Sequence, residues 1–83
     1  MSERSRQIRQ VIGFFWPDDE LAHTPGGFMS QLIRTICKAD QTNQNLLSIP
    51  YPTVVAAVRD AQQKREGRMI LASVVRHDEE GPL

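Results

Sequence analysis

Residues 26–40, GGFMSQLIRTICKAD, carry the clearest pattern in the chain. Their apolar side chains form two adjacent rows at intervals of four residues: Phe28, Leu32 and Ile36, and Met29, Ile33 and Cys37. Side chains with this spacing share one face of an α-helix, and the polar residues between them cover the opposite face. We therefore predict a helix from about Phe28 to Ala39 whose apolar stripe packs in the core, with Phe28 pointing inward.

A second, shorter helix is predicted directly after this one. Asp40 is of a residue type that commonly caps a helix N-terminus, and it precedes QTNQNLLSI at residues 41–49. Pro50 and Pro52 restrict the residues before them to extended conformations, so the sequence IPYP separates this helix from the next.

The segment from Pro52 to Gly67 predicts a third helix. Proline suits the first turn of a helix, and glycine suits the position where a helix ends. Asp60 and Lys64 lie four residues apart, which favours an ion pair along the helix surface. The apolar stripe of this helix consists of Val54, Val55, Val58 and Ala61.

Earlier in the chain, Pro17 and the acids of WPDDELAH predict one or two helical turns, which HTPGG ends.

The patterns at the two ends of the predicted domain are ambiguous. Residues 8–16 and 68–76 both have apolar side chains at helical spacing, yet their β-branched content also suits strands. The predicted fold is mainly α: a single domain of three to four helices at residues 8–76. The two end segments are predicted either as additional helices or as a minor two-stranded sheet. Residues 1–7 are predicted to be a flexible N-terminus, and residues 77–83 a flexible acidic tail.

The overall composition bounds the function. The 83 residues allow one domain, and ten basic side chains balance ten acidic ones, so no net charge draws the chain to nucleic acid or to anionic lipid. No apolar run approaches the length of a membrane span. A single cysteine, Cys37, excludes an internal disulfide and fits a reducing compartment. We therefore expect a cytoplasmic protein without membrane contact.

Few residues suggest catalysis or a cofactor. Cys37 lies on the apolar stripe of the best helix, which is typical of a buried structural thiol. His23 follows Asp18, Asp19 and Glu20, but no recognised metal-ligand spacing is present. The sequence TPGGF lacks the lysine and the hydroxyl residue of a phosphate-binding loop. We therefore predict a non-enzymatic protein with no cofactor and no metal.

Four of the five aromatic residues of the chain lie between residues 14 and 28. Three of these, Phe14, Phe15 and Trp16, are consecutive, and neither a helix nor a strand directs three consecutive side chains into one core. We therefore predict that at least one of them lies near the surface and binds a partner, most simply a second copy in a homodimer, with Trp16 as the anchor.

The rival prediction is a small DNA-binding regulator of the helix-turn-helix type. Two short helices followed by a third have the required order. However, the first turn of the third helix is apolar, and the cations cluster at its other end: Lys64, Arg65 and Arg68. In this alternative, these three side chains contact phosphates.

The central pattern FxxxLIxxIxKADxxN comprises Phe28, Leu32–Ile33, Ile36, Lys38–Asp40 and Asn43, and it is followed by Leu47, a proline and an apolar helix. In this pattern the chain resembles a group of small uncharacterised proteins of actinobacteria and their phages, over a little under half of its length. Such proteins carry an aromatic–proline pair after the leucine, which Tyr51–Pro52 represents here, although Pro50 is an additional proline. The resemblance implies a small helical module of phage or prophage origin and brings no activity. Together with the residue analysis, it leads us to expect a protein-interaction module that regulates a host or self partner.

Overall fold

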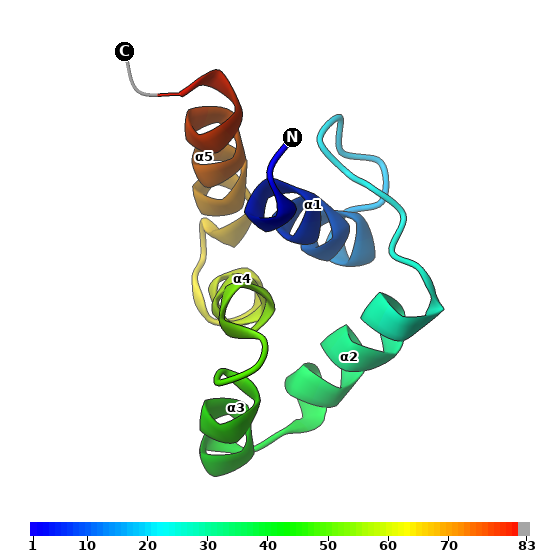
Figure 1. Ribbon diagram of the computed structural model, residues 1–83, viewed down its shortest axis with the longest axis vertical. Coiled ribbons are helices and arrows are strands. Elements are labelled where there is room, and N and C mark those ends of the chain that lie inside the picture. Colours follow the sequence, from blue (N-terminus) through cyan, green and yellow to red (C-terminus); the bar gives the residue numbers. More distant parts are fainter. Residues whose placement is uncertain (82–83) are drawn as a thin grey trace.

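The computed structural model describes residues 1–81, and these residues form five α-helices and no strand (Figure 1). The helices are α1 (Glu3–Phe15), α2 (Gly27–Lys38), α3 (Gln41–Leu47), α4 (Pro52–Gln63) and α5 (Gly67–Glu80). The mainly helical fold class is confirmed. The predicted number of three to four helices and the minor sheet are not confirmed: both ambiguous end segments are helices, α1 and α5, as in the first of the two alternatives.

Helical structure also extends beyond the predicted limits of the domain, residues 8 and 76. Helix α1 begins at Glu3 because Ser2 caps it: the Ser2 hydroxyl accepts a hydrogen bond from the Ser5 N–H at 3.0 Å. Helix α5 continues through the acids 78–80 and ends at Glu80. Residues 82–83 of the predicted acidic tail lie outside the described residues.

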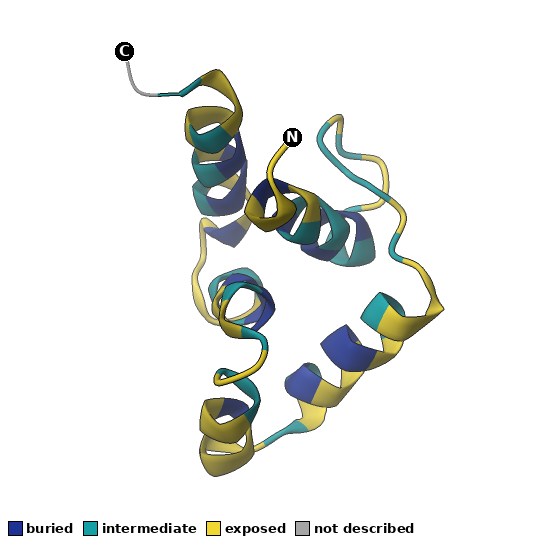
Figure 2. Ribbon diagram, in the orientation of Figure 1, coloured by how far each residue is buried: buried dark blue, intermediate teal, exposed yellow. Residues whose placement is uncertain are grey.

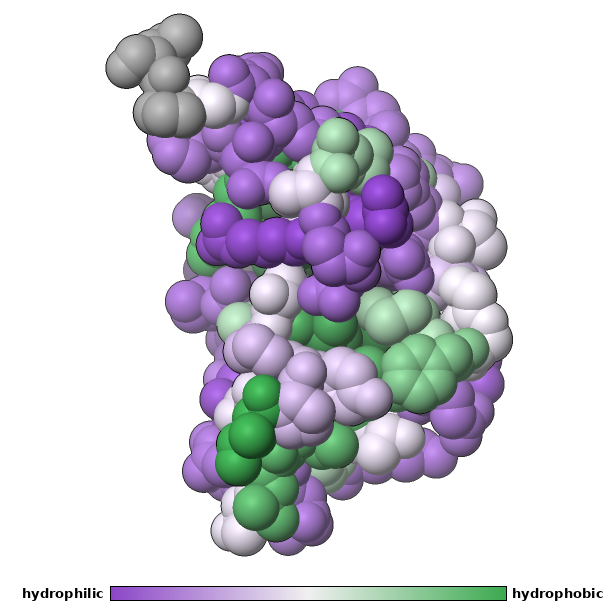
Figure 3. All heavy atoms as spheres, viewed as in Figure 1, coloured by the Kyte–Doolittle hydropathy of each residue, from purple (hydrophilic) through white to green (hydrophobic). Residues whose placement is uncertain are grey.

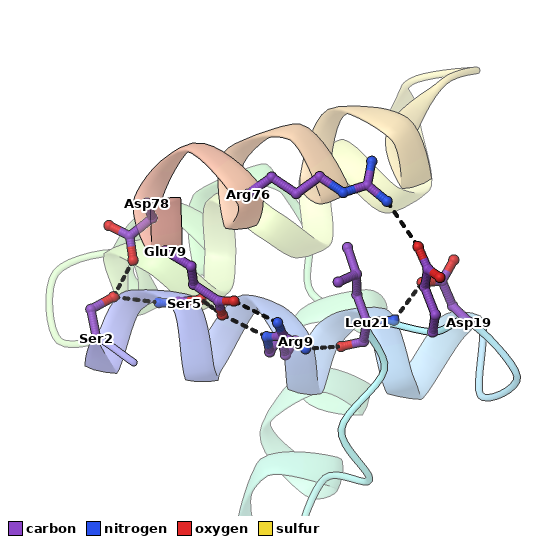
Figure 4. A network of polar contacts seen from close by, with 9 residues as sticks. Ser2, Ser5, Arg9, Asp19, Leu21, Arg76, Asp78 and Glu79 are labelled. Atoms are coloured by element: carbon purple, nitrogen blue, oxygen red, sulfur yellow. Dashed lines mark hydrogen bonds and ion pairs between the residues drawn. The ribbon is translucent and has the colours of Figure 1, made fainter. Parts of the chain in front are cut away.

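The two ends of the chain are joined by polar contacts between α1 and α5 (Figure 4). The Arg9 guanidinium donates to both carboxylate oxygens of Glu79, at 2.6 and 2.7 Å, and the Ser5 hydroxyl donates to the same carboxylate. The Ser2 hydroxyl donates to Asp78. Hydrogen bonds from Arg9 and Ser5 stabilise the ionised form of Glu79 and lower its pKa to about 2. Residues 3–7 and 77–80 are thus part of the folded helices.

Helix α4 is the central element of the core and contacts each of the other four helices. Val54, Val55 and Val58 are fully buried, as the apolar stripe predicts, whereas Ala61 is half-buried and Ala57 is buried in addition. Figure 2 shows that the buried surfaces of α1, α2 and α5 face this helix. Their buried large apolar residues are Ile8, Val11, Ile12, Leu32, Ile33, Ile36, Leu71 and Val75.

Helix α2 lies where the sequence predicts it, but its first turn differs from the prediction. Leu32, Ile33 and Ile36 are buried, whereas Phe28 is 65 % exposed, so its inward placement is wrong. Phe28 is the second residue of α2 and precedes the turns that pack against α4. Its ring instead lies near Tyr51, with 6.0 Å between the ring centroids.

The junction of α2, α3 and α4 is fixed by two polar side chains. The predicted cap is confirmed, because the Asp40 carboxylate accepts a hydrogen bond from the Asn43 N–H at 2.8 Å. Gln44 is buried: its amide nitrogen donates to the Ile36 carbonyl oxygen at 2.9 Å, and its amide oxygen accepts from Arg59 at 3.0 Å. One side chain therefore joins the end of α2 to α3 and α4.

One predicted helix is absent, and one predicted helix end is wrong. Residues 17–21 form turns instead of a helix, with the Asp19 N–H donating to the Trp16 carbonyl at 3.0 Å. Helix α4 ends at Gln63, and Gly67 begins α5 instead of ending α4. A Cβ at Gly67 would lie 2.2 Å from the Asp60 carbonyl oxygen, so this glycine permits a close approach of α5 to α4. The predicted ion pair between Asp60 and Lys64 is confirmed at 3.0 Å.

The connection from α1 to α2 folds back along α1. The His23 N–H donates to the Arg9 carbonyl at 3.0 Å, and the Arg9 side chain donates to the Leu21 carbonyl at 3.3 Å. Asp19 accepts from the Leu21 N–H at 2.9 Å and from Arg68 of α5 at 2.7 Å, and these hydrogen bonds lower its pKa. Asp19 therefore links this connection to α5.

Candidate protein-binding surface

Three of the exposed large apolar residues come from neighbouring segments of the fold. Phe28 at the start of α2, Leu46 on α3 and Ile49 in the turn after α3 are 65 %, 59 % and 79 % exposed. Figure 3 shows apolar surface gathered over α2, α3 and the turn into α4, in the lower half of the view. We call this surface the α2–α3 face and define it by Phe28, Leu46, Ile49 and Tyr51. Apolar side chains that gather on one face mark interaction sites more often than isolated ones do.

A groove between α2 and α3 adjoins the exposed residues. Its volume is about 500 Å³. Leu46 and Leu47 supply apolar lining from α3, and Ala39, directly after α2, supplies a further apolar side chain. The complete lining is Thr35, Lys38, Ala39, Asn43, Leu46 and Leu47. The groove offers a depression beside the most exposed apolar side chains.

The turn between α3 and α4 holds Ile49 in a defined position. The Ile49 N–H donates to the Leu46 carbonyl at 3.3 Å, and the Tyr51 N–H donates to the Leu47 carbonyl at 3.0 Å. Pro50 follows directly and restricts the Ile49 backbone. Ile49 is therefore presented to solvent by a hydrogen-bonded turn, so little conformational entropy is lost when a partner covers it.

The charges near the α2–α3 face are mainly positive. Arg34 and Lys38 lie one turn apart on α2, and neither forms an ion pair with any residue among 1–81. Between residues 21 and 59, the sequence contains one carboxylate, Asp40, which caps α3. Lys38, which lines the groove, and Arg34, one turn earlier on α2, are therefore two uncompensated cations.

The three consecutive aromatic residues predicted to bind a partner are all half-buried. Phe14, Phe15 and Trp16 pack against the core, and the centroid distances between neighbouring rings are 5.1 and 5.7 Å. Phe15 is the last residue of α1, and Trp16 has a non-helical backbone. This change of chain direction lets three consecutive side chains cover the edge of one core. Their role in partner binding and in a homodimer stays a prediction.

The three cations of the DNA-binding alternative lie where α4 connects to α5. Lys64 pairs with Asp60 at 3.0 Å, and Arg68 pairs with Asp19 at 2.7 Å. Arg65 is exposed between them in sequence. Two of the three positive charges are thus compensated within the protein, which reduces the attraction that they exert on phosphates.

The residues considered for catalysis or metal binding lie apart from the α2–α3 face or are otherwise engaged. Within residues 1–81, no group of three or more histidine, cysteine or acidic side chains is placed to hold a metal ion. Asp19 and Glu20 pair with Arg68 and Arg76 of α5. Cys37 is half-buried at the end of α2, and burial raises the pKa of its thiol.

The placement of Cys37 predicts slow reaction with thiol reagents. Since the raised pKa lowers the fraction of thiolate, which is the reactive form, native labelling at neutral pH should be several-fold slower than labelling in denaturant. Mass spectrometry after timed exposure to iodoacetamide measures both rates. Native labelling as fast as that of the denatured chain would contradict this assignment.

Comparisons of the chain with protein-family models, with curated proteins and with solved structures give no match. The functional assignment therefore depends on the geometry described above. Within the part of the chain that the structure describes, no helix combines the length and the apolar character needed to cross a membrane.

Proposed function

We propose that this protein is a small, non-enzymatic interaction module that binds another protein through the α2–α3 face. The observation that carries this proposal is the exposure of Phe28, Leu46 and Ile49 on neighbouring segments. Burying a large aliphatic or aromatic side chain contributes about 1.5–3 kcal/mol, so covering these three with a partner is favourable. The core already contains three buried apolar residues of α2 and four of α4, so the three exposed residues are not needed to complete it.

We further propose that the module serves as an accessory regulator in the cytoplasm. The resemblance of the segment from Phe28 to Leu47 to small actinobacterial and phage proteins supports a phage or accessory role. The single cysteine, Cys37, is compatible with a reducing compartment.

Paired serine variants test the proposed surface. In Leu46→Ser/Ile49→Ser, both exposed apolar side chains become polar, whereas Met69→Ser changes an equally exposed side chain on α5. Tagged proteins are used to capture partners from the native host, and quantitative mass spectrometry compares the captured proteins. We expect a partner that wild type and Met69→Ser retain and the double variant loses. Circular dichroism checks that both variants fold, and a captured set that does not depend on Leu46 and Ile49 would contradict the proposal.

DNA binding is the second candidate function, and the observation that favours it is the position of Lys64, Arg65 and Arg68 around one helix connection. The ion pairs of Lys64 and Arg68 weigh against it. A mobility-shift titration against salt separates the two functions. A complex with DNA that persists at physiological ionic strength and weakens with salt would favour this alternative.

Self-association through Phe14, Phe15 and Trp16 is a different route to a protein contact. Sedimentation of the wild type and of Trp16→Ala tests it. A folded monomeric variant of a dimeric parent would support the homodimer, whereas a monomeric wild type would exclude it.

A further inference from the structure

The charge at the edge of the α2–α3 face limits the chemistry of its partner. Lys38 lines the groove beside Leu46, and Arg34 lies one turn earlier on the exposed side of α2. Both cations are without a carboxylate partner among residues 1–81, as are three of the other eight basic side chains, whereas the remaining five form ion pairs. Complementary charges at the edge of an interface accelerate association and select between partners. A segment that covers this face should therefore carry acidic residues beside its apolar ones.

The shape of the face limits the conformation of its partner. The groove runs between two helices, and Leu46 in its lining is followed by exposed Ile49, whose N–H donates to the Leu46 carbonyl. Residues 1–81 contain no strand, so they offer no sheet edge to which an extended peptide could add. An amphipathic helix places apolar side chains at positions i, i+3 or i+4, and i+7, which suits a groove between helices.

We infer that the α2–α3 face binds an acidic amphipathic helix of another protein. This inference rests on the proposed function and specifies its partner. Apolar residues of the bound helix cover Leu46, Ile49 and Phe28, and its acidic residues lie near Arg34 and Lys38.

A second copy of this chain fits the face less well. A two-fold dimer buries the same face of both copies, so Arg34 and Lys38 of each copy would have to find their counter-charges on the same face of the other. No carboxylate between residues 21 and 59 other than Asp40 is present to compensate them. The apolar centre favours such a contact, but the cations at its edge would meet no counter-charge other than Asp40.

Selection from a random peptide library tests the inference even when the natural partner is unidentified. Peptides of about 18 residues, roughly five helical turns, are displayed and selected on the immobilised full-length protein. Counter-selection on Leu46→Ser/Ile49→Ser removes peptides that bind elsewhere. We expect the enriched peptides to combine apolar residues at helical spacing with flanking Asp and Glu, and to become helical on binding.

Charge-neutralising variants test the role of the two cations. In Arg34→Gln/Lys38→Gln, the affinity for a synthesised enriched peptide should fall roughly threefold to tenfold at low salt, and the difference should shrink at high salt. The matched control, Lys64→Gln/Arg65→Gln, removes two charges at the α4–α5 connection and should change the affinity less than about twofold. Fluorescence anisotropy with a labelled peptide measures the affinities of the wild type and of both double variants.

Different outcomes overturn different parts of the inference. Enriched peptides that need Leu46 and Ile49 but are neutral, basic or proline-rich would refute the acidic helix and leave the proposed function standing. Equal peptide affinities of wild type and Arg34→Gln/Lys38→Gln at low salt would also refute the acidic helix and leave the proposed function standing. If no enriched peptide depends on Leu46 and Ile49, both the acidic-helix inference and the proposed function are refuted. If the NMR chemical shifts of Phe28, Leu46 and Ile49 change with protein concentration when no peptide is added, a second copy of this chain is the occupant.

Discussion

Ile36→Ala should lower the free energy of unfolding by about 2–5 kcal/mol, the range found when a large buried aliphatic side chain is truncated. Ile36 is fully buried on the side of α2 that packs against α4. Small domains have only about 5–15 kcal/mol of stability, so this loss is a large fraction of the total. Urea unfolding followed by circular dichroism measures the change.

Phe28→Ala is the matched control for this substitution. Phe28 belongs to the same predicted apolar row of α2, but it is 65 % exposed and its ring lies near that of Tyr51. Its truncation should cost less than about 1 kcal/mol. Equal losses for the two variants would show that Ile36 is not part of a well-packed core.

Gly13→Ala should destabilise the protein by about 1–3 kcal/mol, although alanine normally stabilises a helix interior. A Cβ at Gly13 would lie 2.0 Å from the His23 carbonyl oxygen and 2.8 Å from the His23 carbonyl carbon. Because both contacts are with backbone, the connection from α1 to α2 must move away from α1. The hydrogen bond from the His23 N–H to the Arg9 carbonyl is then weakened or lost. Thermal unfolding and amide exchange at His23 measure the two effects.

Gly27→Ala is the control for Gly13→Ala. Gly27 is the first residue of α2, and a Cβ there would meet no atom within 4 Å. This substitution should leave stability unchanged or raise it by up to about 1 kcal/mol, because alanine has the higher helix propensity. A stabilised Gly13→Ala protein would show that the connection does not lie against α1.

Much of the helical architecture can be predicted from local sequence, whereas the candidate site cannot. The spacing of Leu32, Ile33 and Ile36 predicts both α2 and its buried face, and Asp40 and Pro52 predict where α3 and α4 begin. The sequence patterns do not predict the α2–α3 face, because they place Phe28 in the core and Ile49 in a helix. The one visible signal of this face is Pro50, which disfavours a helical conformation of Ile49 and thereby indicates that this apolar side chain lies beyond the end of α3.

The sequence by itself determined that the chain is helical, where the central helices begin, and which side of each helix is apolar. These properties depend on residues within a few positions of one another, through helical periodicity and capping. Only the tertiary structure decided how the helices cover one another. Arg9 and Glu79 pair although 70 positions separate them, Gly67 allows α5 to approach α4, and Gln44 is buried despite its polarity. Phe28 is exposed for the same reason: periodicity places a side chain on a helix face, but the packing of neighbouring helices decides which turns of that face are covered.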